Sequence, residues 1–195
     1  MYRLKRLFLP ILFFALIFAV MPVIATQLSA PTRANPSALI GVGGEFGTIS
    51  DDGRYVTFES DSPNLVPNDT NGVADIFVYD RQTAQMTRIS VDSSGNQANN
   101  RSQYSQISGN GQFVMFDSYA TNLVPNDTNN QPDIFVHDRI TGQTTRVSVD
   151  SAGNQHEYLI PDSFPTYANW LSYDGRYVTF TSFADNLVAG NSGFI

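Results

Sequence analysis

Apolar side chains recur along this chain in short runs that turn-forming residues separate. Within residues 87–91, apolar Ile89 and Val91 alternate with polar residues, which is the period of a strand with one solvated face. Residues 76–78 (Ile-Phe-Val) are apolar throughout, so both faces of that strand need cover. After residue 30 no long segment repeats apolar residues at helical spacing. The pattern therefore predicts an all-β protein with short strands.

One segment occurs three times. ISDDGRYVTF at residues 49–58 returns as ISGNGQFVMF at 107–116 and as LSYDGRYVTF at 171–180. Alignment of residues 49–97 with residues 107–155 needs no gap and gives 31 identities in 49 positions. The chain is therefore interpreted as a tandem repeat with units at about residues 45–99, 100–160 and 161–195, the last one partial.

Each unit divides into the same pieces. In the second unit, strands are expected at residues 104–108, 113–118, 133–138 and 144–149, with turn-forming residues between them. Four such strands predict an antiparallel meander. A small sheet with two apolar faces has to stack against its neighbours, and radial stacking of such sheets is a β-propeller.

The motif S-x-D-G-R-Y-V-x-F, followed by D-I-F-V-Y-D-R-x-T-x-x-x-T-R-x-S, resembles the TolB-type, WD-like β-propeller repeat of bacterial exported proteins. The resemblance covers about residue 46 to residue 195. It implies a propeller fold and leaves the function open, because one fold serves many functions. Two features depart from the simplest blade. These are the long NLVPNDTN loop and a period of 58 residues, longer than the roughly 40–50 usual for such repeats.

The number of units is low for this fold, since propellers close with about 4–8 blades. Two complete units and one partial unit predict an incomplete propeller. We expect the chain to be a fragment of a longer protein. Assembly of several copies is the alternative.

The first residues form a separate segment. Three basic residues precede an apolar run at residues 7–20, and small residues follow Pro22, which is typical of a secretory signal peptide. Residues 1–25 are therefore predicted to be a signal peptide and residues 26–44 a linker. An uncleaved membrane anchor is the alternative for the first segment and the only expected membrane contact.

Charge and composition narrow the possible partners. The formal net charge is −7, and no lysine follows Lys5, so the surface should repel phosphate backbones and nucleic-acid binding is not expected. Cysteine is absent, which excludes disulfides, thiolate nucleophiles and cysteine-based zinc sites.

The NLVPNDTN loop is the first place to look for a specific site. Each loop offers two hard oxygen ligands and is followed by a third: Asp69, Asn71 and then Asp75 in the first unit, and Asp127, Asn129 and then Asp133 in the second. Calcium takes such ligands, but the glycine and late glutamate of an EF-hand loop are missing. Asx turns, in which Asn and Asp side chains bond nearby backbone amides, are the favoured interpretation. No metal and no cofactor are therefore predicted.

No catalytic residue is predicted. His156-Glu157 lacks the second histidine of a zincin motif, and no G-x-S-x-G elbow occurs. Two groups of residues are candidates for sites, and a structural role is expected for both. The repeated charged residues are expected to form ion pairs between strands or sheets: Asp80, Arg81 and Arg88, with Asp138, Arg139 and Arg146. The aromatic residues are expected to pack between blades rather than to line a sugar-binding face: Tyr104, Tyr167 and Trp170.

These observations predict an exported, non-catalytic binding or scaffold module that presents its loops to a protein or a glycan. Its expected location is secreted, periplasmic or on the cell surface. The alternative is a fragment of a propeller enzyme, similar to a glycosidase or a lyase, whose active site lies in further blades.

Overall fold

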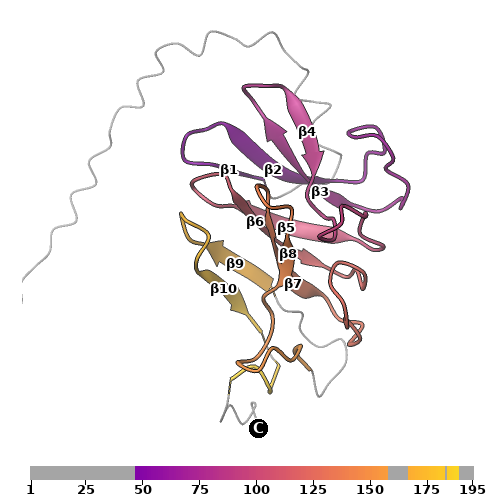
Figure 1. The fold of residues 1–195 in the computed structure, drawn as a ribbon, viewed down its shortest axis with the longest axis vertical. Helices are drawn as coiled ribbons and strands as arrows, with labels where there is room; N and C mark the ends of the chain where they lie inside the picture. Colours follow the sequence, from indigo (N-terminus) through magenta and orange to yellow (C-terminus); the bar gives the residue numbers. More distant parts are fainter. Residues whose placement is uncertain (1–46, 158–166, 183, 189–195) are drawn as a thin grey trace, which may run out of the picture. The chain divides into compact units, whose positions relative to one another are not determined.

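A computed structural model of the chain describes residues 47–157, 167–182 and 184–188. In this part of the chain there are ten strands and no helix, which confirms the all-β prediction (Figure 1). The strands are β1 (Thr48–Ile49), β2 (Tyr55–Ser60), β3 (Asp75–Asp80), β4 (Gln85–Arg88), β5 (Ser102–Ile107), β6 (Phe113–Ser118), β7 (Asp133–Asp138), β8 (Thr144–Arg146), β9 (Tyr167–Leu171) and β10 (Val178–Thr181). The expected signal peptide and linker lie outside the described residues.

The strands form three antiparallel sheets. Two of them have four strands, in the orders β1-β2-β3-β4 and β5-β6-β7-β8, and β9 pairs with β10 in the third. Each complete sheet is a meander in which equivalent residues pair: Tyr55 with Asp80 in the first sheet, and Phe113 with Asp138 in the second. The prediction of four-stranded propeller blades, two complete and one partial, is confirmed at the level of the sheets.

Two predicted strands of the second sheet have different bounds. β5 begins two residues early, and it contains a bulge at which Tyr104 has a positive φ of 56°. β8 ends at Arg146 instead of residue 149, because the Ser148 side chain replaces a backbone carbonyl in the next hydrogen bond between the strands. The backbone N–H of Ile134 donates to the Ser148 hydroxyl at 3.1 Å rather than to a carbonyl.

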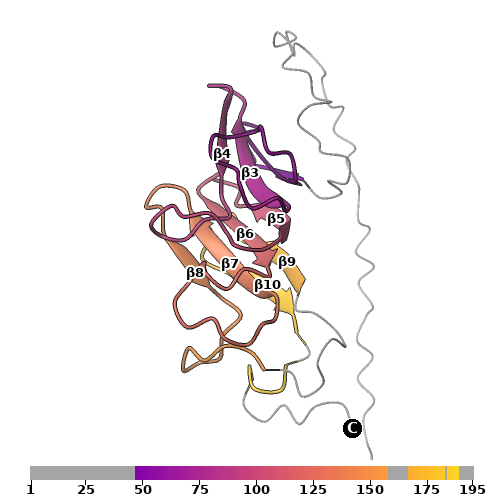
Figure 2. The ribbon, with the colours of Figure 1, turned by 90° about the vertical axis from the view of Figure 1, so that its right-hand side faces the viewer.

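The sheets stack face to face, and the core lies between them (Figure 2). Alternate residues of β6 serve two different cores. Val114 and Phe116 pack with residues of the first sheet such as Ile76, whereas Met115 packs with Leu171 of the third sheet. Phe116 is completely buried, and burial of such a side chain contributes about 2–3 kcal/mol. Both faces of the second sheet are thus covered, as the apolar runs in the sequence predict.

No helix in the described residues is long and apolar enough to cross a membrane.

Candidate functional site

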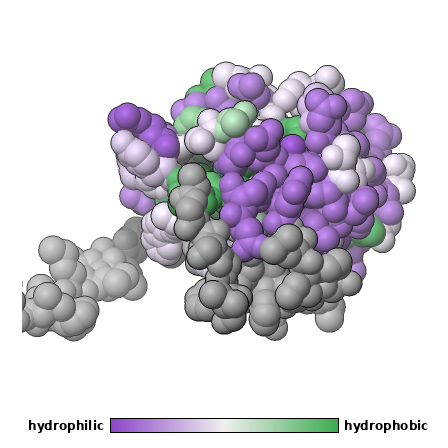
Figure 3. Space-filling view, turned by 90° about the horizontal axis from the view of Figure 1, so that it is seen from below, coloured by the Kyte–Doolittle hydropathy of each residue, from purple (hydrophilic) through white to green (hydrophobic). Residues whose placement is uncertain are grey.

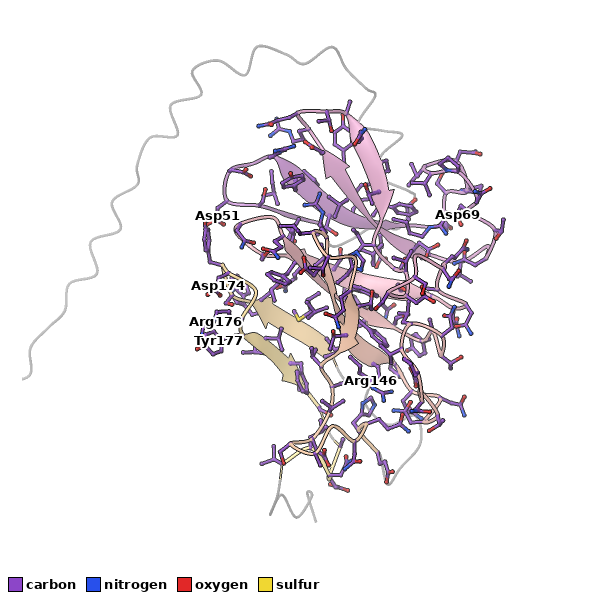
Figure 4. All side chains as sticks on the ribbon, viewed as in Figure 1. Asp51, Asp69, Arg146, Asp174, Arg176 and Tyr177 are labelled. Atoms are coloured by element: carbon purple, nitrogen blue, oxygen red, sulfur yellow. The ribbon has the colours of Figure 1, made fainter. Side chains whose placement is uncertain are left out.

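The loops and turns of the stacked sheets gather at two ends (Figure 4). One end carries the two long loops, and Asp69 and Arg146 lie there. The other end carries the short turns between the first two strands of each sheet, near Asp51 and Asp174. Each end is a candidate site, because each brings equivalent residues of successive sheets together.

At the loop end, the first sheet has a buried cluster of Asp69, Asn71, Asp75 and Arg88, called here the first acid–arginine cluster. Arg88 reaches from β4, with Nη2 3.6 Å from Asp69 Oδ2 and Nε 3.7 Å from Asp75 Oδ2. Asn71 donates to Asp75 Oδ2 at 2.9 Å and accepts from the backbone of Val73 at 3.1 Å, which is an Asx turn. A guanidinium therefore faces the oxygens that were weighed as calcium ligands.

The second acid–arginine cluster repeats this arrangement with Asp127, Asn129, Asp133 and Arg146. Arg146 Nη1 lies 3.4 Å from Asp127 Oδ1 and 3.2 Å from Asp133 Oδ2. Asn129 accepts from the backbone of Gln131 at 3.0 Å, as Asn71 does in the first loop. No group of three or more acidic, histidine or cysteine residues within the described ranges has a metal-binding arrangement.

His156 distinguishes the second cluster. Its Nδ1 lies 3.0 Å from Asp133 Oδ1, both side chains are fully buried, and the equivalent residue of the first sheet is Ala98. Burial raises the pKa of Asp127 to about 6, and the nearby charge of Asp133 adds to this shift, while Arg146 and His156 oppose it. Burial likewise raises the pKa of Asp75 in the first cluster, opposed chiefly by the hydrogen bonds from Ser90 and Asn71.

The first asparagine of the NLVPNDTN loop joins successive sheets. Asn122 accepts from the backbone of Asn99 at 2.9 Å and donates to the carbonyl of Gln97 at 2.9 Å. Asn186 makes the equivalent bonds to Glu157 and Gln155. Sequence reasoning missed this role, although an asparagine stands at this position in all three copies. Much of the polarity of the loop is therefore explained by structure rather than by a ligand.

At the other end, three turns form what is called here the turn row: residues 51–53, 109–111 and 173–175. In each turn a serine hydroxyl bonds the Asp or Asn two residues later, as between Ser50 and Asp52 at 2.6 Å. The closing glycine has a positive φ, 69° at Gly53, that other residues rarely adopt. These bonds explain the S-x-D/N-G motif as a hairpin turn.

Backbone hydrogen bonds connect the three turns directly. Asp51 N donates to Gly109 O at 2.9 Å, and Asn110 N donates to Tyr173 O at 3.1 Å. The side chains of Asp51, Asp52, Tyr173 and Asp174 are exposed along this row. The result is a hydrogen-bonded row of three turns whose exposed acidic and aromatic side chains come from the first and third sheets.

Aromatic side chains dock onto the glycines of the turn row. The Tyr55 ring fills the space in which a Cβ of Gly111 would lie, and the guanidinium carbon of Arg139 sits 3.9 Å from the ring centroid. Arg139 Nη1 also donates to Gly111 O. Phe113 covers Gly175 in the same way. We call each such contact an aromatic lock.

The predicted ion pairs are correct in part. Arg146 pairs with acidic residues of its own sheet, but Asp80 pairs with Arg54 and not with a neighbour in sequence. The Arg54 pair is bidentate, with distances of 3.0 and 2.7 Å, and this bond is the main reason why the pKa of Asp80 is lowered. Arg81 instead donates to the carbonyl of Gly53 at 2.6 Å.

Trp170, which was expected to pack between blades, is not covered by any sheet of the described residues. Its side chain is 70% exposed, because it lies on the face of the third sheet opposite Leu171, and only the Leu171 face packs on the second sheet. Tyr104 is half-buried in the bulge of β5. The side chain of Tyr167 lies outside the described residues. The coloured part of the face seen in Figure 3 is mainly hydrophilic, with apolar residues scattered between polar ones.

The fold and the turn row define an all-β protein made of stacked antiparallel meanders, which is an incomplete set of propeller blades. No protein-family model matches the sequence, and no curated protein matches it.

Three solved structures show what the chain is similar to. TolB from Acinetobacter baumannii aligns at 16% identity and a TM-score of 0.38, over 72% of this chain and 32% of that one. A protein assigned as TolB from Agrobacterium tumefaciens aligns at 18% and 0.40, over 72% and 49%. The tricorn protease aligns at 16% and 0.31, over 71% and 13%. The chain thus spans less than half the length of each.

Proposed function

We propose that the protein is a non-catalytic binding or scaffold module that acts outside the cytoplasm and presents the turn row to a protein or a glycan. The observation that carries this proposal is the hydrogen-bonded row of turns with its exposed side chains. A recognition surface built on a rigid frame loses little conformational entropy when it binds.

The chemistry of the turn row suits a ligand rich in hydroxyl or basic groups. The Ser50 hydroxyl and the Arg54 backbone amide lower the pKa of Asp52, and the Arg176 amide and Ser172 hydroxyl lower that of Asp174. Both carboxylates are therefore anionic at neutral pH and accept hydrogen bonds. Tyr173 is 63% exposed beside them, and its ring offers an apolar face to a sugar or an aliphatic side chain.

The buried acids support a structural rather than a catalytic role. A raised carboxyl pKa such as that of Asp127 is typical of active sites, but ion-pair networks produce it as well. The Asp127 side chain is only 2% exposed and faces Arg146, so a substrate cannot reach it without opening the loop. The alternative of a propeller enzyme would place its active site in other blades.

The location outside the cytoplasm rests on the sequence alone. It is supported by the leader-like pattern of residues 1–25 and by the acidic composition.

The proposal is tested by measuring binding of the full chain to a glycan array and, in parallel, to basic peptides. We expect Tyr173→Ala and Asp174→Asn to weaken the observed binding at least tenfold, which corresponds to about 1.4 kcal/mol. Asp61→Asn is the matched control, since Asp61 is an exposed acid that directly follows β2, at the loop end. Binding that survives both turn-row substitutions would contradict the proposal, and cleavage of a bound glycan would favour the enzyme.

A further inference from the structure

The aromatic lock joins each sheet to the next one in a fixed pattern. The second strand of a sheet turns every other residue toward the following sheet: Tyr55 and Thr57 in the first sheet, and Phe113 and Met115 in the second. Tyr55 docks on Gly111, and Thr57 Oγ1 donates to Ser105 Oγ at 3.0 Å. Met115 packs with Leu171 of the third sheet. Each complete sheet thus has a trailing face that the next sheet covers.

The third sheet repeats this trailing face with no sheet stacked on it in the described part of the chain. Tyr177 stands where Tyr55 and Phe113 stand in the earlier copies, and it is 66% exposed. Thr179 is exposed as well, and so is Trp170 on the paired strand β9. Figure 4 shows Arg176 and Tyr177 together beside β9 and β10. The face therefore presents the aromatic half of a lock.

The first sheet carries the other half. Gly53 corresponds to Gly111, and Arg81 corresponds to Arg139. Arg81 already bonds the Gly53 carbonyl at 2.6 Å, as Arg139 bonds that of Gly111. Among the described residues, however, no aromatic ring covers Gly53. A Cβ there would meet only Arg81 Nη1 at 3.6 Å and Ile49 Cδ1 at 4.0 Å, and Ile49 is 52% exposed.

We propose that two copies of this chain associate head to tail, with Tyr177 of one copy seated on Gly53 and beneath Arg81 of the other. The contact would reproduce between chains the lock that Tyr55, Gly111 and Arg139 make within one chain. A contact between two different surfaces closes into a ring or continues as a filament, according to its rotation. Two copies would bring the number of sheets into the range of about 4–8 in which propellers close. This interface uses Gly53 of the turn row but none of the side chains to which ligand binding is assigned, which are Asp52, Tyr173 and Asp174.

Cross-linking tests the contact directly, because the chain contains no cysteine. An Asp174→Cys chain and an Asp51→Cys chain, which keep all residues of the lock intact, are mixed with a short thiol-specific cross-linker. Both positions are exposed and lie in the turns that would face each other. We expect a linked dimer in the mixture and none with either variant alone. The Asn110→Cys, Tyr173→Cys double variant is the internal standard, since the bond from Asn110 N to Tyr173 O at 3.1 Å joins the corresponding turns within one chain. An absent dimer, despite a reactive standard, would overturn the proposal.

Sedimentation velocity supplies a second measurement. Tyr177→Ala and Arg81→Ala should each raise the dissociation constant of self-association at least tenfold. Ile140→Ala is the control, since Ile140 is 76% exposed but lies in the turn between β7 and β8. Association through the apolar residues 7–20 would respond to none of these changes and would contradict the lock. A monomeric wild-type chain would overturn it too, and would leave a further blade of a longer polypeptide as the occupant.

Discussion

The two acid–arginine clusters have the same backbone and the same two aspartates, asparagine and arginine. They differ in the side chains that surround the carboxylates. In the second cluster a buried His156 lies 3.0 Å from Asp133, whereas the equivalent position of the first unit is Ala98. The pKa of Asp75 is raised in the first cluster, and that of Asp127 in the second. One substitution between repeats thus places a histidine beside a carboxylate pair that otherwise has the same asparagine and arginine partners. The comparison indicates that the clusters hold the long loops, while their titration is set by local neighbours.

Among the substitutions in these clusters, removal of the arginine should lower the free energy of unfolding most. Arg146→Met leaves Asp127 and Asp133 buried without their cation, and such a loss typically costs about 3–5 kcal/mol. Arg88→Met should cost less, because the distances in the first cluster are longer, at 3.6 and 3.7 Å. Urea unfolding of both variants measures the difference. Equal losses would show that the clusters are energetically alike.

The strands of the sheets could be predicted from the sequence, but the contact of Arg88 with the loop carboxylates could not. The sequence predicts strands 133–138 and 113–118 with the bounds that β7 and β6 have, because short uninterrupted apolar runs indicate burial on both faces. The same pattern identified the loop carboxylates but not their partner. Arg88 meets them because it pairs across the sheet with Phe77, and that register is a property of the folded strands.

The contact between His156 and Asp133 could not be predicted from the sequence either. It lies 23 residues after Asp133 and belongs to a connection rather than to a strand. The only signal for it was the difference from Ala98 in the aligned copy, and that difference does not reveal which side chain it contacts. The aromatic locks were hidden for a similar reason, since Tyr55 and Gly111 belong to different units.

The second largest expected effect is a pH dependence of stability that arises from the raised pKa of Asp127. Its pKa in the folded chain, about 6, lies above its ordinary value of 3.8, so the folded state binds more protons between these pH values. This group therefore lowers stability as pH rises from about 4 to 6. Asp127→Asn abolishes the dependence. The stability of the variant relative to wild type should rise by up to about 3 kcal/mol between pH 4 and pH 7.

Asp69→Asn is the matched control for this measurement, because Asp69 is the equivalent residue of the first loop. Urea midpoints at a series of pH values follow both variants. A pH profile of Asp127→Asn that runs parallel to wild type would contradict the assignment of the raised pKa to Asp127.

His156→Ala should make the second cluster more like the first. The variant loses a fully buried side chain and its contact with Asp133, and we expect a loss of about 2 kcal/mol. His156 also opposes the rise in the pKa of Asp127, so the pH transition of that carboxyl should move upward in the variant. Thermal unfolding at several pH values measures both effects. A loss of stability without any movement of the transition would restrict His156 to packing.

The smallest expected difference concerns the two loop asparagines. Asn71 Nδ2 bonds both Asp75 Oδ2 at 2.9 Å and Ala98 O at 3.0 Å, whereas Asn129 Nδ2 bonds the backbone carbonyl of His156 at 3.1 Å. Asn71→Ala should therefore cost about 1 kcal/mol more than Asn129→Ala, which is the usual worth of one hydrogen bond. Paired urea curves resolve such a difference. If Asn129→Ala proved the more damaging, the second loop would depend on its Asx turn and not on the bond to the His156 carbonyl.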